Sequence, residues 1–266
     1  MKAWVISDIH LFRAIGMKTS SPFPVPQAEV CILAGDVSDD LDVSLNYLIY
    51  EIGPHMPVVA VLGNHDYYGT SIVAALANAR AAVAGSNVHL LENDRIELGG
   101  VRFIGATLWT DFEISVGDGD EDYPAELRLE IARRDVVHLI NDFTEIRREG
   151  GGSITVDDLR ERHFQSRAFI TDELVKPFSG KTVVLTHHLP LTACLDQRYH
   201  GNLSNAAYAS DLSQIIDDCG PDIWVHGHVH QRQDFMRGRT RIICNPRGMW
   251  HQAGESGYKS DLVIDL

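Results

Sequence analysis

The first third of this 266-residue chain alternates short apolar runs with helix-like segments, and this alternation constrains the fold more than any other feature. Apolar runs of strand length cover residues 2–7, 29–34 and 57–62. A helix-like segment at about 41–51 separates the second run from the third, and the alanine-rich segment 71–84 follows the third. Strands separated by helices pair in parallel and have helices on the faces of their sheet. The pattern therefore predicts an α/β protein.

The rest of the chain adds strands of a different kind. Residues 88–109 contain short strand-like runs around Gly99-Gly100, which is a hairpin signal and predicts antiparallel or mixed pairing. A short helix is expected at about 211–219, where Gly220-Pro221 stops it. The remaining expected strands are 182–186, 222–226, a hairpin over 231–244 that turns at Gly238, and 261–265.

Residues 111–180 interrupt this strand pattern. A long helical pattern runs from Pro124 to about Arg148, and the glycines at 150–152 end it. Thr155 is a good N-cap for a second helix. We expect a single domain over residues 1–266, with residues 111–180 as a helical insertion or cap within it.

Charge and composition exclude several classes of protein. The chain has 37 acidic and 23 basic residues, and this formal charge of −14 disfavours binding to long nucleic acids, which requires a basic surface. The four cysteines are scattered and indicate neither a thiolate zinc site nor a disulfide framework. The N-terminus lacks the features of a signal peptide, and no apolar run approaches the roughly 18 residues of a membrane span. We therefore expect a cytoplasmic protein without a membrane partner.

Polar clusters follow five of the apolar runs at the point where each run ends. They are Asp8-x-His10, Gly35-Asp36, Gly63-Asn64-His65-Asp66, His187-His188 and Gly227-His228-Val229-His230. Ligand sites in open α/β sheets lie outside the carboxyl ends of the strands, so we expect these clusters to converge. Carboxylate, amide and imidazole donors without thiolates suit a divalent Mn, Fe, Zn, Co, Ni or Mg ion.

The number of donors is sufficient for two ions if one carboxylate is shared. Asp36 is the natural bridge, because each oxygen of a carboxylate can bind one ion. Two ions roughly 3.5–4 Å apart are the arrangement that promotes in-line displacement at phosphorus. Glycines beside Asp36, Asn64 and His228 permit sharp turns and close approach of the backbone.

Taken in this order, the motifs resemble the signature of the calcineurin-like metallophosphoesterases. The resemblance runs from the N-terminus to residue 230 and does not cover the insertion; the match of the segment 244–248 to a family loop is loose. It implies a two-sheet mixed β-sandwich flanked by helices, with two divalent metal ions at the strand ends. The implied ligands are Asp8, His10 and His230 for one ion, Asn64, His187 and His228 for the other, and Asp36 as the bridge.

The resemblance also implies a catalytic pair and a reaction. His65 would face the phosphate and leaving group without binding metal, and Asp66 would orient His65. A metal-bound hydroxide would attack phosphorus in line, and His65 would protonate the leaving group. The expected substrate is a small phosphomonoester or phosphodiester. A metal-dependent nuclease and a non-catalytic metal-binding scaffold for protein partners are the alternatives.

Several residues keep more than one interpretation. His187 is favoured over His188 because it ends the strand and fits the family pattern, while His226 is expected to be packed. The acidic loop 118–122 lacks the glycine and glutamate of an EF-hand, which favours a solvated loop over a calcium site. Arg232, Arg237, Arg239 and Arg241 either steer a phosphate or lie outward on a surface hairpin. The other groups that could line the cavity are Tyr67, His200, Arg247 and His251. The sequence leaves open the oligomeric state, the metal pair and the choice between monoester and diester.

Overall fold

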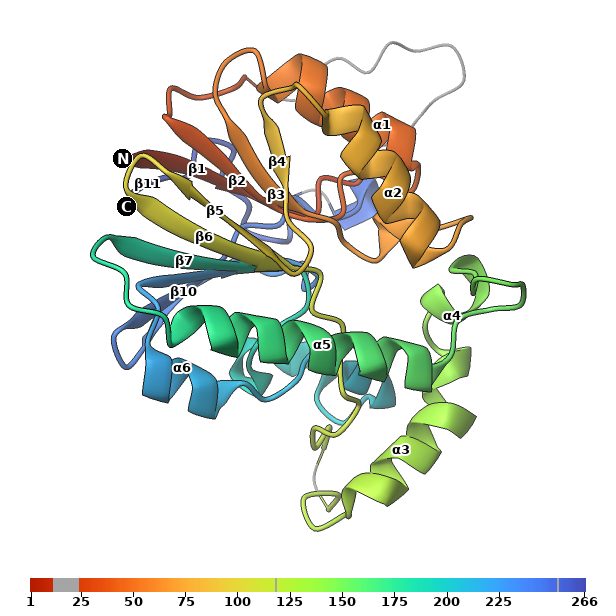
Figure 1. Cartoon of the computed structure of the whole chain (residues 1–266). Coiled ribbons are helices and arrows are strands. Elements are labelled where there is room, and N and C mark those ends of the chain that lie inside the picture. Colours follow the sequence, from red (N-terminus) through yellow and green to blue (C-terminus); the bar gives the residue numbers. More distant parts are fainter. Residues whose placement is uncertain (12–23, 118, 253) are drawn as a thin grey trace.

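Two β-sheets pack face to face in the computed structural model, which describes residues 1–11, 24–117, 119–252 and 254–266 (Figure 1). In the described chain, the first sheet has the order β11-β1-β2-β3-β4 and the second the order β5-β6-β7-β8-β10-β9. The first sheet consists of β11 (Val263–Asp265), β1 (Lys2–Ile6), β2 (Val30–Ala34), β3 (Val58–Val61) and β4 (Val88–Leu90). The second consists of β5 (Asp94–Leu98), β6 (Val101–Ala106), β7 (Lys181–Thr186), β8 (Ile223–His226), β10 (Thr240–Cys244) and β9 (Gln233–Arg237).

Helices cover the outer face of each sheet. On the first sheet lie α1 (Leu41–Asn46), which a π-helical turn at Tyr47–Ile52 extends, and α2 (Ile72–Val83). On the second sheet lie α5 (Val156–Leu174) and α6 (Ser213–Cys219). The two-sheet α/β sandwich expected from the sequence is thereby confirmed. No helix in the described part of the chain combines the length and apolar character needed to cross a bilayer.

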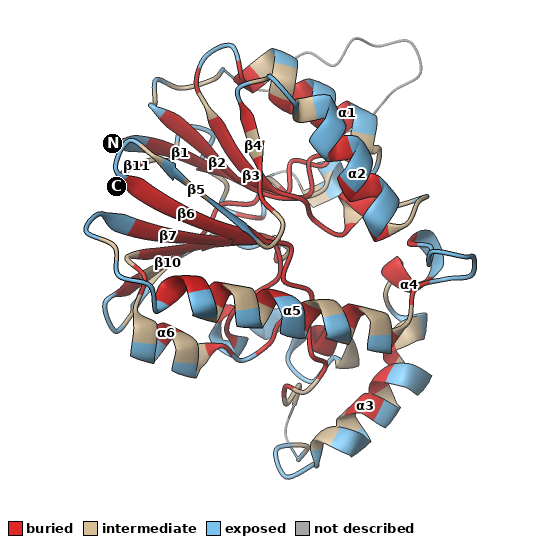
Figure 2. Ribbon diagram, in the orientation of Figure 1, coloured by how far each residue is buried: buried red, intermediate tan, exposed pale blue. Residues whose placement is uncertain are grey.

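Both faces of the central strands are buried, as the red strands of Figure 2 show. In β1, Ala3 and Val5 pack between the two sheets, while Trp4 and Ile6 pack against the outer layer that contains α1 and α2. A strand buried on both faces needs apolar side chains at successive positions. This is why the strand runs in the sequence are continuous rather than alternating.

The central strands of each sheet are parallel, and antiparallel strands lie beside them. β1, β2, β3 and β4 pair in parallel, as do β6, β7, β8 and β10. β11, β5 and β9 pair antiparallel at edges of the sheets. The carboxyl ends of the parallel strands therefore lie at one end of the sandwich.

The prediction of one long helix from Pro124 to about Arg148 is wrong. The chain instead forms α3 (Ala125–Arg134), a 3-10 turn (Val136–His138) and the short α4 (Asp142–Glu145). Two β-branched valines follow Asp135, and Asn141-Asp142 also favours turns over helix interiors. The second expected helix is confirmed: α5 follows Thr155, whose side chain accepts the Asp158 N–H in a capping box.

Candidate metal centre

The loops that follow β1 and β2 lie side by side at the carboxyl end of the first sheet. The Asp8 N–H donates to the Gly35 carbonyl at 3.0 Å, and the His10 N–H donates to the Asp36 carbonyl at 3.1 Å. Parallel pairing of these strands thus continues as backbone hydrogen bonds between the two loops. It brings two motifs together that are separated by more than twenty residues in the sequence.

Four of the expected ligand positions have a left-handed backbone. The φ angles are 49° at Asp8, 45° at His10, 55° at Asp36 and 69° at His228. Residues other than glycine rarely adopt this backbone conformation. It costs of order 1–3 kcal/mol for each residue, and such residues cluster at functional sites. The surrounding hydrogen bonds hold these residues in place; for example, the His228 N–H donates to Asp8 Oδ1 at 2.9 Å.

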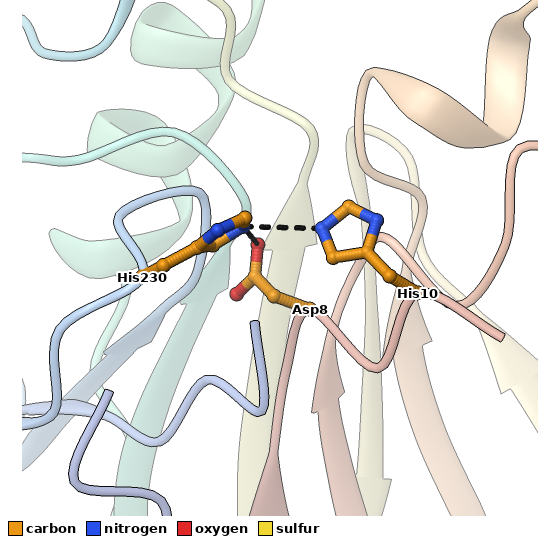
Figure 3. Close-up of side chains that lie close together, drawn as sticks. All are labelled: Asp8, His10 and His230. Carbon is orange, nitrogen blue, oxygen red and sulfur yellow. Dashed lines mark hydrogen bonds and ion pairs between the residues drawn. The ribbon is translucent and has the colours of Figure 1, made fainter. Parts of the chain in front are cut away.

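The first cluster of donors consists of Asp8, His10 and His230 (Figure 3). His10 Nε2 lies 3.1 Å from His230 Nε2, and His230 Nε2 lies 3.7 Å from Asp8 Oδ1. Asp8 Oδ2 is buried and has no hydrogen-bond partner among the residues that the structure describes. A carboxylate beside two imidazoles is a donor set that fits a divalent cation.

Gln252 orients one imidazole of this cluster. His230 Nδ1 lies 2.7 Å from Gln252 Oε1, so Nδ1 carries the proton and donates it, and Nε2 is left free to bind a cation. Gln252 Oε1 also accepts the Met249 N–H at 3.0 Å, which fixes the amide. No motif in the sequence marks Gln252.

The second cluster joins Asp36, His187 and His228, and Asn64 lies against it. His187 Nε2 is 3.0 Å from Asn64 Oδ1, 3.2 Å from His228 Nδ1 and 3.4 Å from Asp36 Oδ2. His187 Nδ1 lies 2.7 Å from the Ala34 carbonyl and donates to it, so Nε2 is the ring nitrogen that faces the acceptors Asn64 Oδ1 and Asp36 Oδ2. Acceptors this close repel each other unless a cation or proton lies between them, and the donor set therefore fits a metal ion.

Asp36 belongs to the second cluster and also lies close to His10 of the first. Its Oδ2 is 3.4 Å from His187 Nε2 and 3.8 Å from His10 Nε2, and its Oδ1 accepts the His65 N–H at 3.0 Å. Burial alone would raise the pKa of this carboxyl, but the charges of His187 and His65 hold it well below its usual value. The Asp36 carboxylate therefore stays ionised at the position that a bridging ligand needs.

His65 is paired with Asp39. His65 Nδ1 lies 2.7 Å from Asp39 Oδ1, and His65 Nε2 lies 3.9 Å from Asp36 Oδ2. Burial lowers the pKa of His65, but the neighbouring carboxylates of Asp36 and Asp39 outweigh burial and raise that pKa to about 9. The imidazole is therefore protonated near neutral pH, as a proton donor must be. The only signal for Asp39 in the sequence is its place three residues after Asp36 on the same loop.

The expected role of Asp66 is wrong. Within the described residues, its Oδ2 accepts the backbone N–H groups of Asp36 at 3.0 Å and Gly63 at 2.9 Å, and its Oδ1 accepts from Ser44 Oγ at 2.6 Å. Asp66 therefore fixes the backbone that carries the shared carboxylate. Asp39, and not Asp66, orients the His65 ring.

Gly63 permits the close approach of Asp36. A Cβ atom at position 63 would overlap Asp36 Oδ1 and lie 2.6 Å from the Asp36 backbone nitrogen. We expect Gly63→Ala to lower the free energy of unfolding by about 1–3 kcal/mol, as overpacking of a tight interior does. Thermal denaturation with and without added Mn²⁺ checks this. A variant that melts at the wild-type temperature in both conditions would contradict it.

The structure also places the histidines whose interpretation was open. His188 Nδ1 lies 3.1 Å from the Thr107 carbonyl, and its ring packs against the rings of His228 and Trp109. His188 lies outside the donor clusters found among the described residues, whereas His187 lies inside one. His226 is buried and also lies outside them, which agrees with the expectation that it is packed.

The charged groups away from these clusters have other partners. Of the acidic loop, Asp118 lies outside the described residues; the carbonyls of Asp120 and Glu121 accept from the Arg128 guanidinium, each at 2.9 Å. The Arg128 guanidinium already donates to these carbonyl oxygens, which favours a solvated loop over a calcium site. Of the hairpin arginines, Arg237 pairs with Asp217, Arg232 and Arg241 pair with Asp234, and Arg239 donates to the carbonyls of Cys219 and Gly220.

The loop after β10 supports the loop after β1. The N–H groups of Arg247 and Gly248 donate to the carbonyls of Ser7 at 3.0 Å and Asp8 at 2.9 Å. The Arg247 guanidinium donates to the Ile9 carbonyl at 2.8 Å. The segment 244–248 therefore positions the backbone that carries Asp8 and His10.

The sandwich and its clusters of carboxylate, amide and imidazole donors define the class of metallophosphoesterases. The chain belongs to the calcineurin-like phosphoesterase family, whose model matches residues 1–232. An uncharacterized protein of Acanthamoeba polyphaga mimivirus is 27% identical over 256 residues, covering 88% of this chain and 83% of that protein.

Two solved structures have a similar fold. A phosphopantetheinyl hydrolase from Mycobacterium tuberculosis matches with a TM-score of 0.71 at 19% identity, over 94% of this chain and 90% of that one. A dimetal phosphatase from Danio rerio matches with a TM-score of 0.52 at 13% identity, over 91% and 86% of the two chains. At these identities the similarity shows the fold, which agrees with the two flanked mixed sheets described above.

Gln252→Ala tests how much the orientation of the His230 ring contributes to the affinity for a divalent ion. Because the variant removes the acceptor of His230 Nδ1–H, we expect the affinity for a divalent ion to fall about 10–100-fold. Titration calorimetry with Mn²⁺ measures this on chelator-treated protein, and His251→Ala is a control on the neighbouring position. Unchanged affinity in Gln252→Ala would show that the hydrogen bond does not matter for binding.

Proposed function

We propose that this chain is a dinuclear metal-dependent hydrolase of small phosphate esters. The observation that carries the proposal is the position of Asp36 between two donor clusters, one containing Asp8, His10 and His230 and the other His187 and His228. Asn64 would complete the second set through its Oδ1. Two bound divalent cations would supply Lewis acidity, lowering the pKa of a water and neutralising charge on the phosphoryl oxygens.

The residues of the chain would supply orientation and proton transfer. Asp39 would hold His65 so that its protonated Nε2 faces the donor clusters, where the leaving group of a bound ester would lie. His65 would give its proton to the departing alkoxide and would be reprotonated from solvent. Asp66 would act indirectly, by fixing the backbone of Asp36.

A cavity next to the clusters favours a small substrate. It has a volume of about 260 Å³, and His228, His230 and Gln252 form the wall next to the donor clusters. Arg198 lies in the wall, and its charge is balanced by Asp196, which it contacts at 2.7 Å. A neutral, hydrogen-bonding cavity of this size suits the alcohol part of a small ester. The excess of acidic residues in the chain disfavours long polyanions.

A substrate panel on metal-reconstituted protein tests the proposal. The panel contains an aryl phosphate, an alkyl monoester, a cyclic nucleotide, a phosphopantetheinyl ester, a phosphopeptide and DNA, each with Mn²⁺. The phosphopantetheinyl ester is included because a solved structure of similar fold bears that activity in its name. We expect hydrolysis of at least one small ester that Asp36→Ala abolishes.

Other outcomes of the panel would replace the proposal. Preferred cleavage of DNA would make the chain a metal-dependent nuclease. Binding of two ions without hydrolysis of any member would favour a non-catalytic scaffold. The single domain over residues 1–266 and the cytoplasmic location stay predictions.

A further inference from the structure

The helical insertion contributes a buried carboxylate to the metal centre. Asp142, the first residue of α4, is only 2% exposed. Its Oδ1 accepts from Asn64 Nδ2 at 2.7 Å and from the Tyr68 hydroxyl at 2.8 Å. Asn64 and Tyr68 follow β3 in the first sheet, whereas Asp142 lies more than seventy residues later in the chain. One oxygen of the insertion therefore binds two side chains of the sandwich.

Backbone hydrogen bonds attach the insertion at the same place. The Gly69 N–H donates to the Glu145 carbonyl at 2.9 Å, and the Arg147 N–H donates to the Thr70 carbonyl at 2.9 Å. These bonds join α4 and the residues after it to the segment that directly follows the Asn64 motif. Figure 1 shows α4 next to α3, near the N-terminal end of α5. A lid that swings freely would have to break these bonds together with both bonds of Asp142.

The orientation of the Asn64 amide decides whether it can bind a cation. A primary amide offers an oxygen lone pair at one end and two N–H donors at the other. In this structure Nδ2 faces Asp142, and Oδ1 faces His187 Nε2 at 3.0 Å. The reverse orientation would turn an NH2 group toward the cation and its oxygen toward a carboxylate, and both contacts would be repulsive.

We propose that Asp142 is a positioning residue of the metal centre, which holds the Asn64 amide with its oxygen toward the second donor cluster. This inference rests on the proposed function, because it assumes that Asn64 binds an ion. The part of the insertion around α4 is then a fixed part of the site rather than a movable cap. Tyr68 extends the effect to His65, since the two rings lie 4.5 Å apart.

Two substitutions of Asp142 separate its positioning role from its contribution to folding. Asp142→Ala removes the acceptor, whereas Asp142→Asn keeps one carbonyl oxygen, which is sufficient because both bonds go to Oδ1. Mn²⁺ binding to chelator-treated protein is measured by titration calorimetry, together with the melting temperature. We expect Asp142→Ala to weaken one of two Mn²⁺ sites about 10–100-fold and to leave the other within a few fold. Asp142→Asn should retain most of the affinity at both sites.

Two further variants control for the neighbourhood of Asp142. Glu145→Gln changes an exposed side chain on the same helix and should bind Mn²⁺ as the wild type does. Tyr68→Phe removes one donor to Asp142 and the 3.5 Å contact of the Tyr68 hydroxyl with Asn64 Nδ2, but leaves the 2.7 Å bond from Asn64 to Asp142, so its Mn²⁺ affinity should fall much less than that of Asp142→Ala.

The inference is overturned by any of three results. They are wild-type Mn²⁺ affinity at both sites in Asp142→Ala, equal weakening of both sites, and equal weakening in Asp142→Asn and Asp142→Ala. Failure of the proposed function gives a different result. In that case the wild type hydrolyses no ester of the panel, while the site-selective loss of Mn²⁺ in Asp142→Ala is still observed.

Discussion

Replacing Asp36 by alanine is expected to lower kcat/KM for any phosphate ester more than about 1,000-fold and to reduce the number of bound divalent ions. Losing an outer hydrogen bond to a metal ligand already costs about 10–100-fold, and Asp36 would contact both ions of the proposed pair directly. Its removal would also leave two groups of histidines facing each other without the anion that lies between them. Metal content by atomic emission and kcat/KM with added Mn²⁺ measure the two effects.

Asp36→Asn sharpens this test. The asparagine has nearly the same shape but offers one oxygen and one NH2 group, so it can serve one ion and repels the other. We expect Asp36→Asn to retain at most one tightly bound ion and to be nearly as inactive as Asp36→Ala. Asp217→Ala is the control, because it removes an exposed aspartate that pairs with Arg237 on the surface. Two tightly bound ions and near wild-type activity in Asp36→Asn would exclude a shared carboxylate.

Replacing His65 by alanine is expected to lower kcat about 10²–10⁴-fold for esters with alkyl leaving groups, the range for loss of a general acid. The effect should be much smaller for a nitrophenyl ester, whose leaving group departs without protonation. Both ions should stay bound, because His65 is not needed in either proposed ligand set. Rates for the two classes of ester, measured at saturating Mn²⁺, give the comparison.

The partner of His65 is tested in the same assay. Asp39→Asn should show the same dependence on the leaving group with a smaller loss, since it weakens the orientation of His65 and lowers the pKa of its ring. In Asp66→Asn the loss of kcat should not depend on the leaving group, because Asp66 binds backbone amides of the Asp36 loop. His55→Ala, an exposed histidine, serves as the control. If His65→Ala lowers kcat by the same factor for both classes of ester, His65 is not the general acid.

The sequence was informative wherever chemistry depends on local pattern. Continuous apolar runs mark strands buried on both faces, and the polar residues that end them must lie at the carboxyl edge of the parallel strands. The Thr155 cap was readable because a capping box involves residues only three apart. The apolar spacing that predicts one long helix over 124–148 continues past Asp135, but the backbone turns there and brings Asp142 to Asn64.

The partners of the site residues could not be read in this way. Asp39 and Asp66 both lie near a motif, and only the folded loops show that Asp39 contacts the His65 ring while Asp66 contacts backbone amides. Gln252 and Asp142 approach His230 and Asn64 from segments that carry no motif. Short polar side chains at such positions have many possible partners, and sequence spacing does not choose among them.

The sequence by itself determined the fold class and which side chains gather at the strand ends, because strand periodicity and parallel pairing impose both. Only the tertiary structure decided how those side chains are oriented. The orientation of an imidazole or an amide depends on a hydrogen bond at its far end, and here that bond comes from Ala34, Gln252, Asp39 or Asp142. All four of these partners lie more than twenty residues along the chain from the group that they orient.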